Sequence, residues 1–383
     1  MDGEARQSAR ESRVIAELKE DIMKALPATL GASEEHYRRL GLSKDHIAPW
    51  EDGMRTDGGK GTYEWWYFDA YLNDGSKLAI TFRTKPIIDV GKPLDPWIDF
   101  NLERADGTSV VQHLHIEPQQ FTASKENCDV VMGANFFKGD LHTYSIHVEA
   151  EGMVVEVSLT GMTQAWRPET GWLFFGEREE YYFAWLPAVP QGNAHITMAV
   201  DGGSPQDYTG IGYHDHNWGN MSMLKLMHDW YWARGKIANY TLIASYITTE
   251  QRYGSKTFPV FMLARDGRVI ADDASKVSFS TREVAIEADT GKPVANQVIY
   301  EYTDGADRYV LTFTRQKDIL HYQFIDELHG IKALLARLIR IDGAYLRFTG
   351  QLAFEHYQAD TLVETHRDEA LWELMYFGHV TQQ

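Results

Sequence analysis

Short segments in which apolar and polar residues alternate recur through most of the chain, and they constrain its fold more than any other feature. Leu78, Ile80 and Phe82 are separated by single small or polar residues, and residues 144–159 repeat this alternation on both sides of a turn. A period of two puts successive side chains on opposite faces of a β-strand. Asp-Gly pairs typical of hairpin turns separate such segments at 74–75, 106–107, 266–267 and 304–305. The sequence therefore predicts many short strands in sandwiches or barrels.

Three segments have helical periodicity instead. Residues 12–26 carry an apolar side chain at every fourth position and end before Pro27. A second short helix is expected from residue 33 to residue 41, and a third over 331–339, where leucine and isoleucine recur at helical spacing. The chain is therefore expected to be mainly β, with a short helical extension at its N-terminus.

The length of the chain and two breaks in its pattern suggest how it divides. A chain of 383 residues is long enough for two domains. The segments 186–193 and 201–207 are rich in proline and glycine and lie on either side of residue 200. We expect a helical extension over 1–58, a first β domain over 59–200 and a second over 201–383.

The overall composition excludes some classes of partner and favours another. The formal net charge is −18, and an acidic surface repels the phosphates of nucleic acids, so no nucleic-acid partner is expected. Aromatic residues make up 13% of the chain, with 11 tryptophans and 20 tyrosines. This content predicts an extensive aromatic interior or a large apolar pocket.

The sequence offers little sign of disulfides, membrane spans or a secretory signal. Cys128 is the single cysteine, so an internal disulfide and a cysteine-based zinc site are both ruled out. Its neighbours do not form a nucleophile signature. There is no run of 18 apolar residues, and the N-terminal residues are polar. We therefore expect a cytoplasmic protein.

The first segment that suggests chemistry is YEWWYFDAYL at residues 63–72. On a strand, Glu64 and Trp66 share one face, while Trp65 and Tyr67 share the other. Both faces are aromatic, so both are expected to be covered. A carboxyl group beside tryptophan tends toward a raised pKa, as an acid catalyst at neutral pH requires. The alternative is a salt-bridged or capped Glu64 in an aromatic core.

The second such segment is GYHDHNWG at residues 212–219. If it is a strand, His214, His216 and Trp218 share one face, and Asp215 and Asn217 share the other. Two histidines at this spacing can bind a metal ion, but no further ligands with recognisable spacing accompany them, so no metal is expected.

Two other interpretations of this segment remain open. In one, its polar side chains only satisfy each other and neighbouring loops in a protein core. In the other, they act in acid–base chemistry or orient a substrate. Trp230 and Trp232 follow shortly afterwards. Dense polar groups followed by tryptophans suit an aromatic pocket with a few convergent polar atoms, which favours the second interpretation.

Together these two segments resemble the motifs of the carotenoid 1,2-hydratase (hydroxyneurosporene synthase) and AttH-like superfamily. Residues 181–202, 229–235 and 371–378 add to the likeness, which runs from about residue 60 to about residue 380. The resemblance implies two lipocalin-like antiparallel β-barrel domains, and it extends to the lipocalin-like Diels–Alderases. It also implies chemistry without a cofactor, on an apolar unsaturated substrate held in an aromatic pocket between the domains.

The resemblance also implies candidate catalytic residues. In the hydratases the proposed group is the second histidine and the tryptophan of the histidine motif, plus a Tyr-x-Asp on a later strand. The matching positions here are His216, Trp218 and Tyr246, but the aspartate position holds Thr248. A threonine cannot protonate an alkene. Either Asp215, Glu64 or His216 supplies the proton, or the protein does not hydrate its substrate.

The leading hypothesis is a cofactor-independent enzyme that cyclises, isomerises or hydrates a C=C bond of an isoprenoid or polyene. Peripheral contact with a membrane would let it collect such a substrate. The expected catalytic residues are His216, Trp218, Tyr246, Asp215 and Glu64, and the expected substrate-binding residues are Trp66, His214, Asn217, Trp230, Trp232 and Thr248. The alternatives are a non-catalytic carrier of a hydrophobic ligand and a metal-dependent hydrolase.

Overall fold

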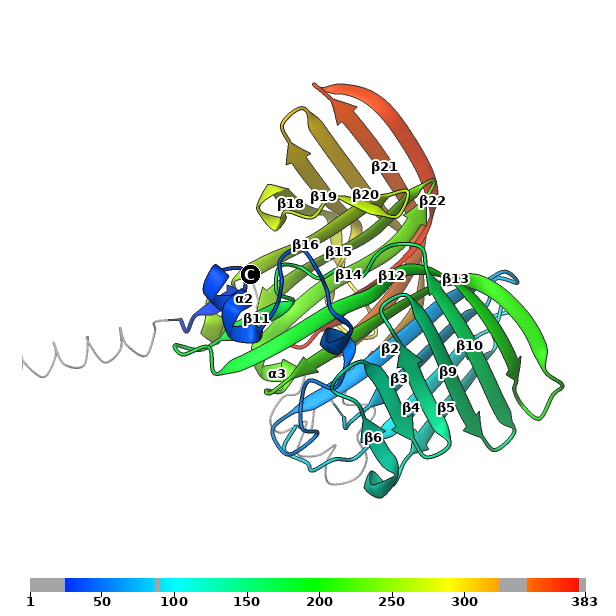
Figure 1. Cartoon of the computed structure of the whole chain (residues 1–383). Coiled ribbons are helices and arrows are strands. Elements are labelled where there is room, and N and C mark those ends of the chain that lie inside the picture. Colours follow the sequence, from blue (N-terminus) through cyan, green and yellow to red (C-terminus); the bar gives the residue numbers. More distant parts are fainter. Residues whose placement is uncertain (1–24, 87–89, 324–342, 379–383) are drawn as a thin grey trace, which may run out of the picture.

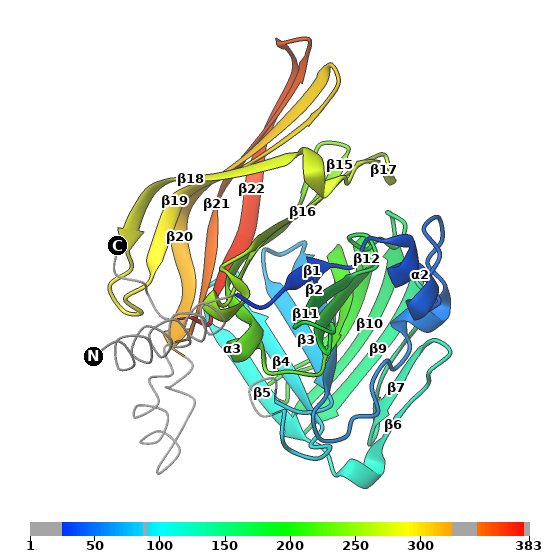
Figure 2. The ribbon, with the colours of Figure 1, turned by 90° about the vertical axis from the view of Figure 1, so that its left-hand side faces the viewer.

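The computed structural model describes residues 25–86, 90–323 and 343–378. Within them the chain forms two curled antiparallel sheets, the first built from the N-terminal half and the second from the C-terminal half (Figure 1, Figure 2). This confirms the expected mainly β class with two lipocalin-like barrels. Among the described residues, no helix is long and apolar enough to cross a membrane. The helices expected over 12–26 and 331–339 fall outside these residues, except for residues 25 and 26.

The first sheet has the strand order β5-β4-β3-β2-β13-β12-β10-β9-β8-β7-β6, with β11 pairing β12 and β1 pairing β11. Its strands are β1 (Ala28–Leu30), β2 (Tyr63–Leu72), β3 (Lys77–Arg83), β4 (Trp97–Glu103), β5 (Ser109–His115), β6 (Phe121–Ala123), β7 (Cys128–Met132), β8 (Asn135–Gly139), β9 (Thr143–Ala150), β10 (Met153–Gly161), β11 (Trp172–Phe175), β12 (Tyr181–Ala199) and β13 (Gln206–Gly219). The expected hairpin over 144–159 is the β9–β10 pair.

The second sheet has the order β17-β16-β15-β14-β22-β21-β20-β19-β18. Its strands are β14 (Met227–Ile237), β15 (Tyr240–Thr249), β16 (Thr257–Arg265), β17 (Arg268–Ala271), β18 (Val277–Ile286), β19 (Pro293–Asp304), β20 (Asp307–Gln323), β21 (Ala344–Gln358) and β22 (Thr361–Tyr376). Residue 200 lies between β12 and β13, which both belong to the first sheet. The chain passes from the first sheet to the second between Gly219 and Met227, through α3 (Met223–Leu226).

Short helical elements connect the strands and tie the N-terminal part to the first sheet. The expected helix at 33–41 is confirmed as α2 (Glu34–Leu40), where the Ser33 side chain accepts from the His36 N–H and Gly41 ends the helix at φ +70°. The other short elements are the 3₁₀ turns η1 (Pro49–Asp52), η2 (Pro118–Gln120), η3 (Gln251–Tyr253) and η4 (Ala274–Lys276). Pairing of β1 with β11 anchors the residues before α2.

The two sheets enclose three separate cores. One fills the inside of the first barrel, one fills the inside of the second barrel, and the third lies between the sheets. Strands β2 and β13 pair at the middle of the first sheet, and nearly all of their side chains are buried or half-buried on both faces. The alternation of side chains along these strands therefore decides which core each residue joins.

Candidate active site

The alternation along β13 sends the polar residues of the GYHDHNWG segment into two different cores. His214 and His216 are 0% exposed and Trp218 is 4% exposed, and all three point into the first barrel. Asp215 and Asn217 point the other way, toward the second sheet. We expected His216 and Trp218 to face a pocket between the domains. They lie inside the first barrel instead, because the even-numbered residues from His214 to Trp218 are on the inner face of β13.

Inside the first barrel, Glu64 and His216 form a closed pair. The Glu64 carboxylate accepts from the backbone N–H groups of Arg55 (2.6 Å) and Thr56 (2.9 Å) and from the Thr56 hydroxyl (2.7 Å). His216 Nε2 lies 2.8 Å from Glu64 Oε1, and the Trp66 ring stacks on the imidazole at 4.7 Å. Glu64 thus has the geometry of a capped, paired carboxylate in an aromatic core, the alternative that its sequence context left open.

A second buried group in the same barrel centres on Asp52 at the end of η1. The Tyr144 hydroxyl donates to Asp52 Oδ2 at 2.5 Å, and His214 Nε2 lies 3.2 Å from the same oxygen. His214 Nδ1 is 2.8 Å from the Tyr67 carbonyl, which only accepts, so this nitrogen carries a proton. Burial alone would raise the pKa of Asp52, but the two histidines and the tyrosine hydroxyl hold it below its ordinary value. Nothing in the local sequence marks Asp52 as part of this network.

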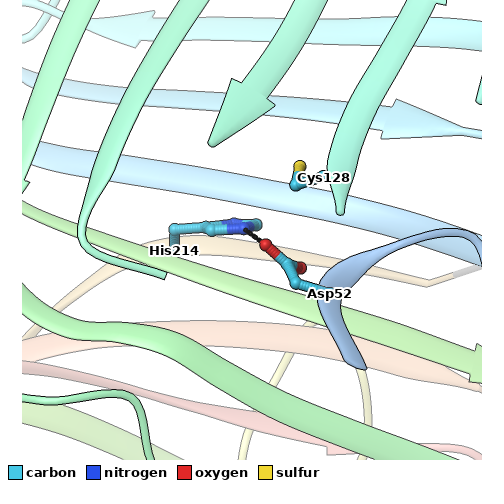
Figure 3. A group of neighbouring side chains, drawn as sticks. All are labelled: Asp52, Cys128 and His214. Carbon is cyan, nitrogen blue, oxygen red and sulfur yellow. Dashed lines mark hydrogen bonds and ion pairs between the residues drawn. The ribbon is translucent and has the colours of Figure 1, made fainter. Parts of the chain in front are cut away.

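Asp52, Cys128 and His214 together could hold a metal ion. One ligand atom from each lies within 4.8 Å of the others, and Figure 3 shows Asp52 and His214 pointing toward each other with the Cys128 sulfur nearby. Burial raises the pKa of the Cys128 thiol well above its ordinary value, which works against a thiolate ligand. Glu287, Asp289 and His321 form a second, more exposed group with suitable atoms. Hydrogen bonds occupy Asp52 Oδ2 and both ring nitrogens of His214, whereas the buried Asp52 Oδ1 has no hydrogen-bond partner among the described residues and lies 3.5 Å from His216 Nδ1. With most of these atoms already paired and the Cys128 thiol neutral, the geometry favours a polar core network over a metal centre.

The space between the two sheets is less completely filled with side chains than the inside of the first barrel. The half-buried side chains between the sheets are Trp65, Tyr67, Trp230, Trp232, Tyr345, Arg347 and Glu373. Side chains that face another sheet and still reach solvent indicate space between the two layers. A cavity of about 190 Å³ lies at one end, lined in part by Asp69, Tyr71, Arg234 and Arg347. We call this space the cleft.

Asp215 is a buried polar group on the face of β13 that lies toward the second sheet. Its Oδ2 accepts from Trp185 Nε1 at 2.8 Å and from the Tyr213 hydroxyl at 2.7 Å, and its Oδ1 accepts from Asn217 Nδ2 at 2.7 Å. The residue is 7% exposed. Burial raises the pKa of Asp215 to about 6, although these hydrogen bonds favour the charged form. The cleft therefore contains a carboxyl group that is partly protonated near neutral pH.

A buried ion pair joins the two sheets beside Asp215. Arg234 on β14 donates through Nε (3.2 Å) and Nη2 to Asp69 on β2, and the Tyr67 hydroxyl donates to the same carboxylate at 3.0 Å. Asp69 is 3% exposed and Arg234 is 4% exposed. The pair fixes the separation of the sheets at this end of the cleft.

The second sheet contributes a further carboxyl group that the sequence did not single out. Glu373 on β22 accepts from the Tyr345 hydroxyl at 2.5 Å. Burial raises the pKa of Glu373 to about 6, against the effects of that hydrogen bond and of the Arg347 charge. Residues 371–378 carry part of the family resemblance, but only the fold brings Glu373 to the side of the second sheet that lies toward β13.

The remaining expected site residues fall on both sides of the second sheet. Trp230 and Trp232 face the cleft, with their rings 6.2 Å from Phe183 and 5.5 Å from Tyr213. Tyr246 points into the second barrel, where it stacks on Phe279 at 3.9 Å. Thr248, two positions along the same strand, has its hydroxyl 3.3 Å from Asp229 Oδ1. Tyr246 and His216 thus lie in different barrels.

Comparison with known proteins gives both a family and a fold. The sequence profile of the Diels-Alderase-like family matches residues 59–332. The quinolone epoxide rearrangement protein asqO of Emericella nidulans is 26% identical over 129 residues, which are 32% of this chain and 34% of that protein. The corresponding protein penF of Penicillium thymicola is 23% identical over 245 residues, 57% of this chain and 64% of that protein. The chain therefore spans less than two thirds of either relative.

Three solved structures share the fold. CghA, crystallised with Sch210972, is 13% identical with a TM-score of 0.57, over 83% of this chain and 89% of that chain. An AttH protein of Nitrosomonas europaea is 16% identical with a TM-score of 0.55, over 86% and 96%. Kievitone hydratase from Nectria haematococca is 12% identical with a TM-score of 0.52, over 93% and 98%. The expected relationship to Diels–Alderase-like proteins is confirmed, and the AttH protein shares the fold.

Proposed function

The chain belongs to the Diels-Alderase-like family, and from this premise we propose that it is a cofactor-independent isomerase acting in the cleft between the sheets. Its substrate is an apolar molecule with an epoxide or a C=C bond, such as an isoprenoid or polyene chain. Asp215 is the proton donor. The observation that carries this proposal is a buried carboxyl group with a pKa of about 6 in an aromatic cleft.

The hydrogen bonds of Asp215 leave one oxygen able to carry the proton. Oδ2 accepts from both Trp185 and Tyr213, while Oδ1 accepts from Asn217 alone among the described residues. A proton on Oδ1 therefore displaces no donor. With a pKa of about 6, roughly a tenth of the molecules carry that proton at pH 7. A general acid with a pKa slightly below the working pH combines adequate occupancy with a strong tendency to donate.

The walls of the cleft suit the charge that such protonation creates. Protonation of an alkene or opening of an epoxide places positive charge on carbon. The rings of Trp232 and Tyr213 pack against each other at 5.5 Å where the two sheets meet, and Trp65 and Trp230 are half-buried between the same sheets. Aromatic faces attract cations by about 0.5–2 kcal/mol each and also accommodate apolar chains. The names of the relatives, which concern epoxide rearrangement, support a reaction without net change in composition.

The histidine network behind β13 has a positioning role in this proposal. His216 and Glu64 hold β13 against β2 from the inner side, since they are register neighbours of Trp66 and Trp218 on the paired strands. Asp215 lies between the two histidines on the same strand. The network thereby fixes the orientation of Asp215 without contacting the substrate.

Turnover of two epoxide probes tests the proposal. Purified protein is incubated with 2,3-oxidosqualene or with a quinolone that carries an epoxide on an unsaturated side chain. We expect a product of the same mass as the probe, without added metal or cofactor. Asp215→Asn should lower the rate about 100-fold or more, whereas Asp360→Asn, at an exposed turn, should leave it unchanged. Unchanged probe recovered from wild-type protein would instead support a carrier.

A further inference from the structure

Glu373 faces the cleft from the second sheet. Its neighbours on β22, Trp372 and Leu374, are each 1% exposed and lie in the core of the second barrel. Alternation along the strand therefore turns Glu373 to the opposite face. In the register of the sheet it stands beside Trp232 on β14 and Arg347 on β21, which lie on that same face.

Aromatic side chains connect Glu373 to Asp215 across the cleft. The ring of Trp232, beside Glu373, lies 5.5 Å from the ring of Tyr213, whose hydroxyl donates to Asp215. Tyr67 is the direct register partner of Asp215 on β2. Burial first, and then the charge of Asp69, raise the pKa of Tyr67 well above its ordinary value, and Glu373 on the second sheet adds to this effect. The two carboxyl groups thus lie on facing sheets, linked through the contact of Trp232 with Tyr213.

The surroundings of the two carboxyl groups differ in charge. Glu373 has the Tyr345 hydroxyl on one oxygen and the guanidinium of Arg347 nearby, and a cation favours the ionised form. The donors to Asp215 are neutral, and the charge of His214, which points into the barrel, also favours the ionised form of Asp215. Asp69, the other acidic group of this wall, is paired with Arg234. Glu373 thus has a cation beside it in the register of its own sheet, which suits a carboxylate that accepts a proton.

We propose that Glu373 is a second catalytic residue, the carboxylate that accepts a proton on the wall opposite Asp215. This assignment rests on the proposed function. Asp215 gives its proton to the epoxide oxygen or alkene carbon, and the C–O bond or the C=C π bond breaks to leave a carbocation. A C–H bond on the adjacent carbon then breaks, its electron pair forms a new C=C bond, and the proton moves to Glu373. The product is an isomer of the substrate, and no water is added.

This division of roles narrows the substrate class. The carbon that becomes positive must carry a hydrogen on a neighbouring carbon, since Glu373 removes that hydrogen. It must also be substituted well enough to support a cation. The branched end of an isoprenoid chain, with methyl groups beside an epoxide or alkene carbon, meets both requirements.

An epoxide that labels carboxylates tests Glu373 without any knowledge of the natural substrate. The probe is 1,2-epoxy-3-(4-nitrophenoxy)propane. An ionised carboxylate attacks its terminal carbon while a neighbouring acid protonates the oxygen, so the ring C–O bond breaks and an ester C–O bond forms. We expect one ester, mapped by mass spectrometry to Glu373, with the fastest labelling near pH 6. Glu369 is exposed on the same strand and reports background labelling.

Variants separate a reactive pair from an accessible side chain. Asp215→Asn should slow labelling of Glu373 at least 10-fold without affecting Glu369, because the proton donor is lost. Tyr345→Phe removes the donor to Glu373 and should move the pH of fastest labelling upward without abolishing the ester. Equal labelling of Glu373 and Glu369, or unchanged labelling in Asp215→Asn, would overturn the assignment. Selective labelling of Glu373 in a protein that turns over neither epoxide probe would sustain the pair and reject the proposed isomerase.

Discussion

Replacing Asp215 with asparagine should remove one pH-dependent component from the stability of the protein. The pKa of Asp215 is about 6 in the folded protein, and its ordinary value is 3.8. At about 1.4 kcal/mol per pKa unit, this difference corresponds to about 3 kcal/mol of destabilisation once the group is ionised. Because the pKa of Asp215 is higher in the folded than in the unfolded protein, the contribution of this group to stability is fully present below pH 3.8. It is lost as the pH rises through 6. About half of that loss, on the order of 1.5 kcal/mol, falls between pH 5 and pH 8.

Asparagine keeps the shape of the side chain and cannot ionise. Its oxygen can still accept from Trp185 and Tyr213, while its amide meets the amide of Asn217, and the resulting mismatch costs about 1–3 kcal/mol at every pH. The useful quantity is therefore the difference in the free energy of unfolding between wild type and variant, followed as a function of pH. Glu373 is present in both proteins, so most of its own contribution cancels.

Guanidinium unfolding followed by tryptophan fluorescence at pH 5, 6, 7 and 8 measures this quantity. Relative to the wild type, the free energy of unfolding of Asp215→Asn should rise by about 1.5 kcal/mol between pH 5 and pH 8, with most of the rise between pH 5 and pH 6. Asp360→Asn serves as the exposed control and should follow the wild type within about 0.5 kcal/mol. If the difference in unfolding free energy between Asp215→Asn and the wild type changes by less than about 0.5 kcal/mol from pH 5 to pH 8, the carboxyl group is unperturbed and its assignment as a neutral-pH acid fails.

Three further predictions concern the cleft and the second sheet. Asp69→Asn leaves the Arg234 guanidinium buried without its carboxylate, so the free energy of unfolding should fall by about 3–5 kcal/mol, and a loss below about 1 kcal/mol would contradict a buried ion pair. Trp185→Phe removes a donor to Asp215 and should shift the pH at which stability falls to above 6, whereas an unmoved pH profile would show that this hydrogen bond does not favour the charged form. In Gly350→Ala the new Cβ would meet a backbone carbonyl oxygen at 2.0 Å, so the denaturant midpoint should fall by the equivalent of about 1–3 kcal/mol, and an unchanged midpoint would show that the paired strands can separate.

The sequence was a good guide to everything that depends on neighbouring residues. Alternation predicted the strands, and the pattern around residue 151 predicted the β9–β10 hairpin. The expectation that His216 and Asp215 lie on opposite faces is met, because that separation follows from the period of two alone. The division near residue 200 relied on two segments rich in proline and glycine, of which 186–193 lies inside β12, where the register shifts, and 201–207 includes the turn between β12 and β13 of the first sheet.

The sequence by itself therefore determined that the chain is a β protein and that each motif has two chemically distinct faces. Only the tertiary structure decided which face meets which partner. Because β2 and β13 are buried on both sides, hydrophobicity could not tell the inside of the barrel from the cleft. Glu373 reaches the cleft with Asp215 only after β22 pairs β14 and the second sheet packs on the first. Such contacts join residues far apart in the chain, and no local pattern encodes them.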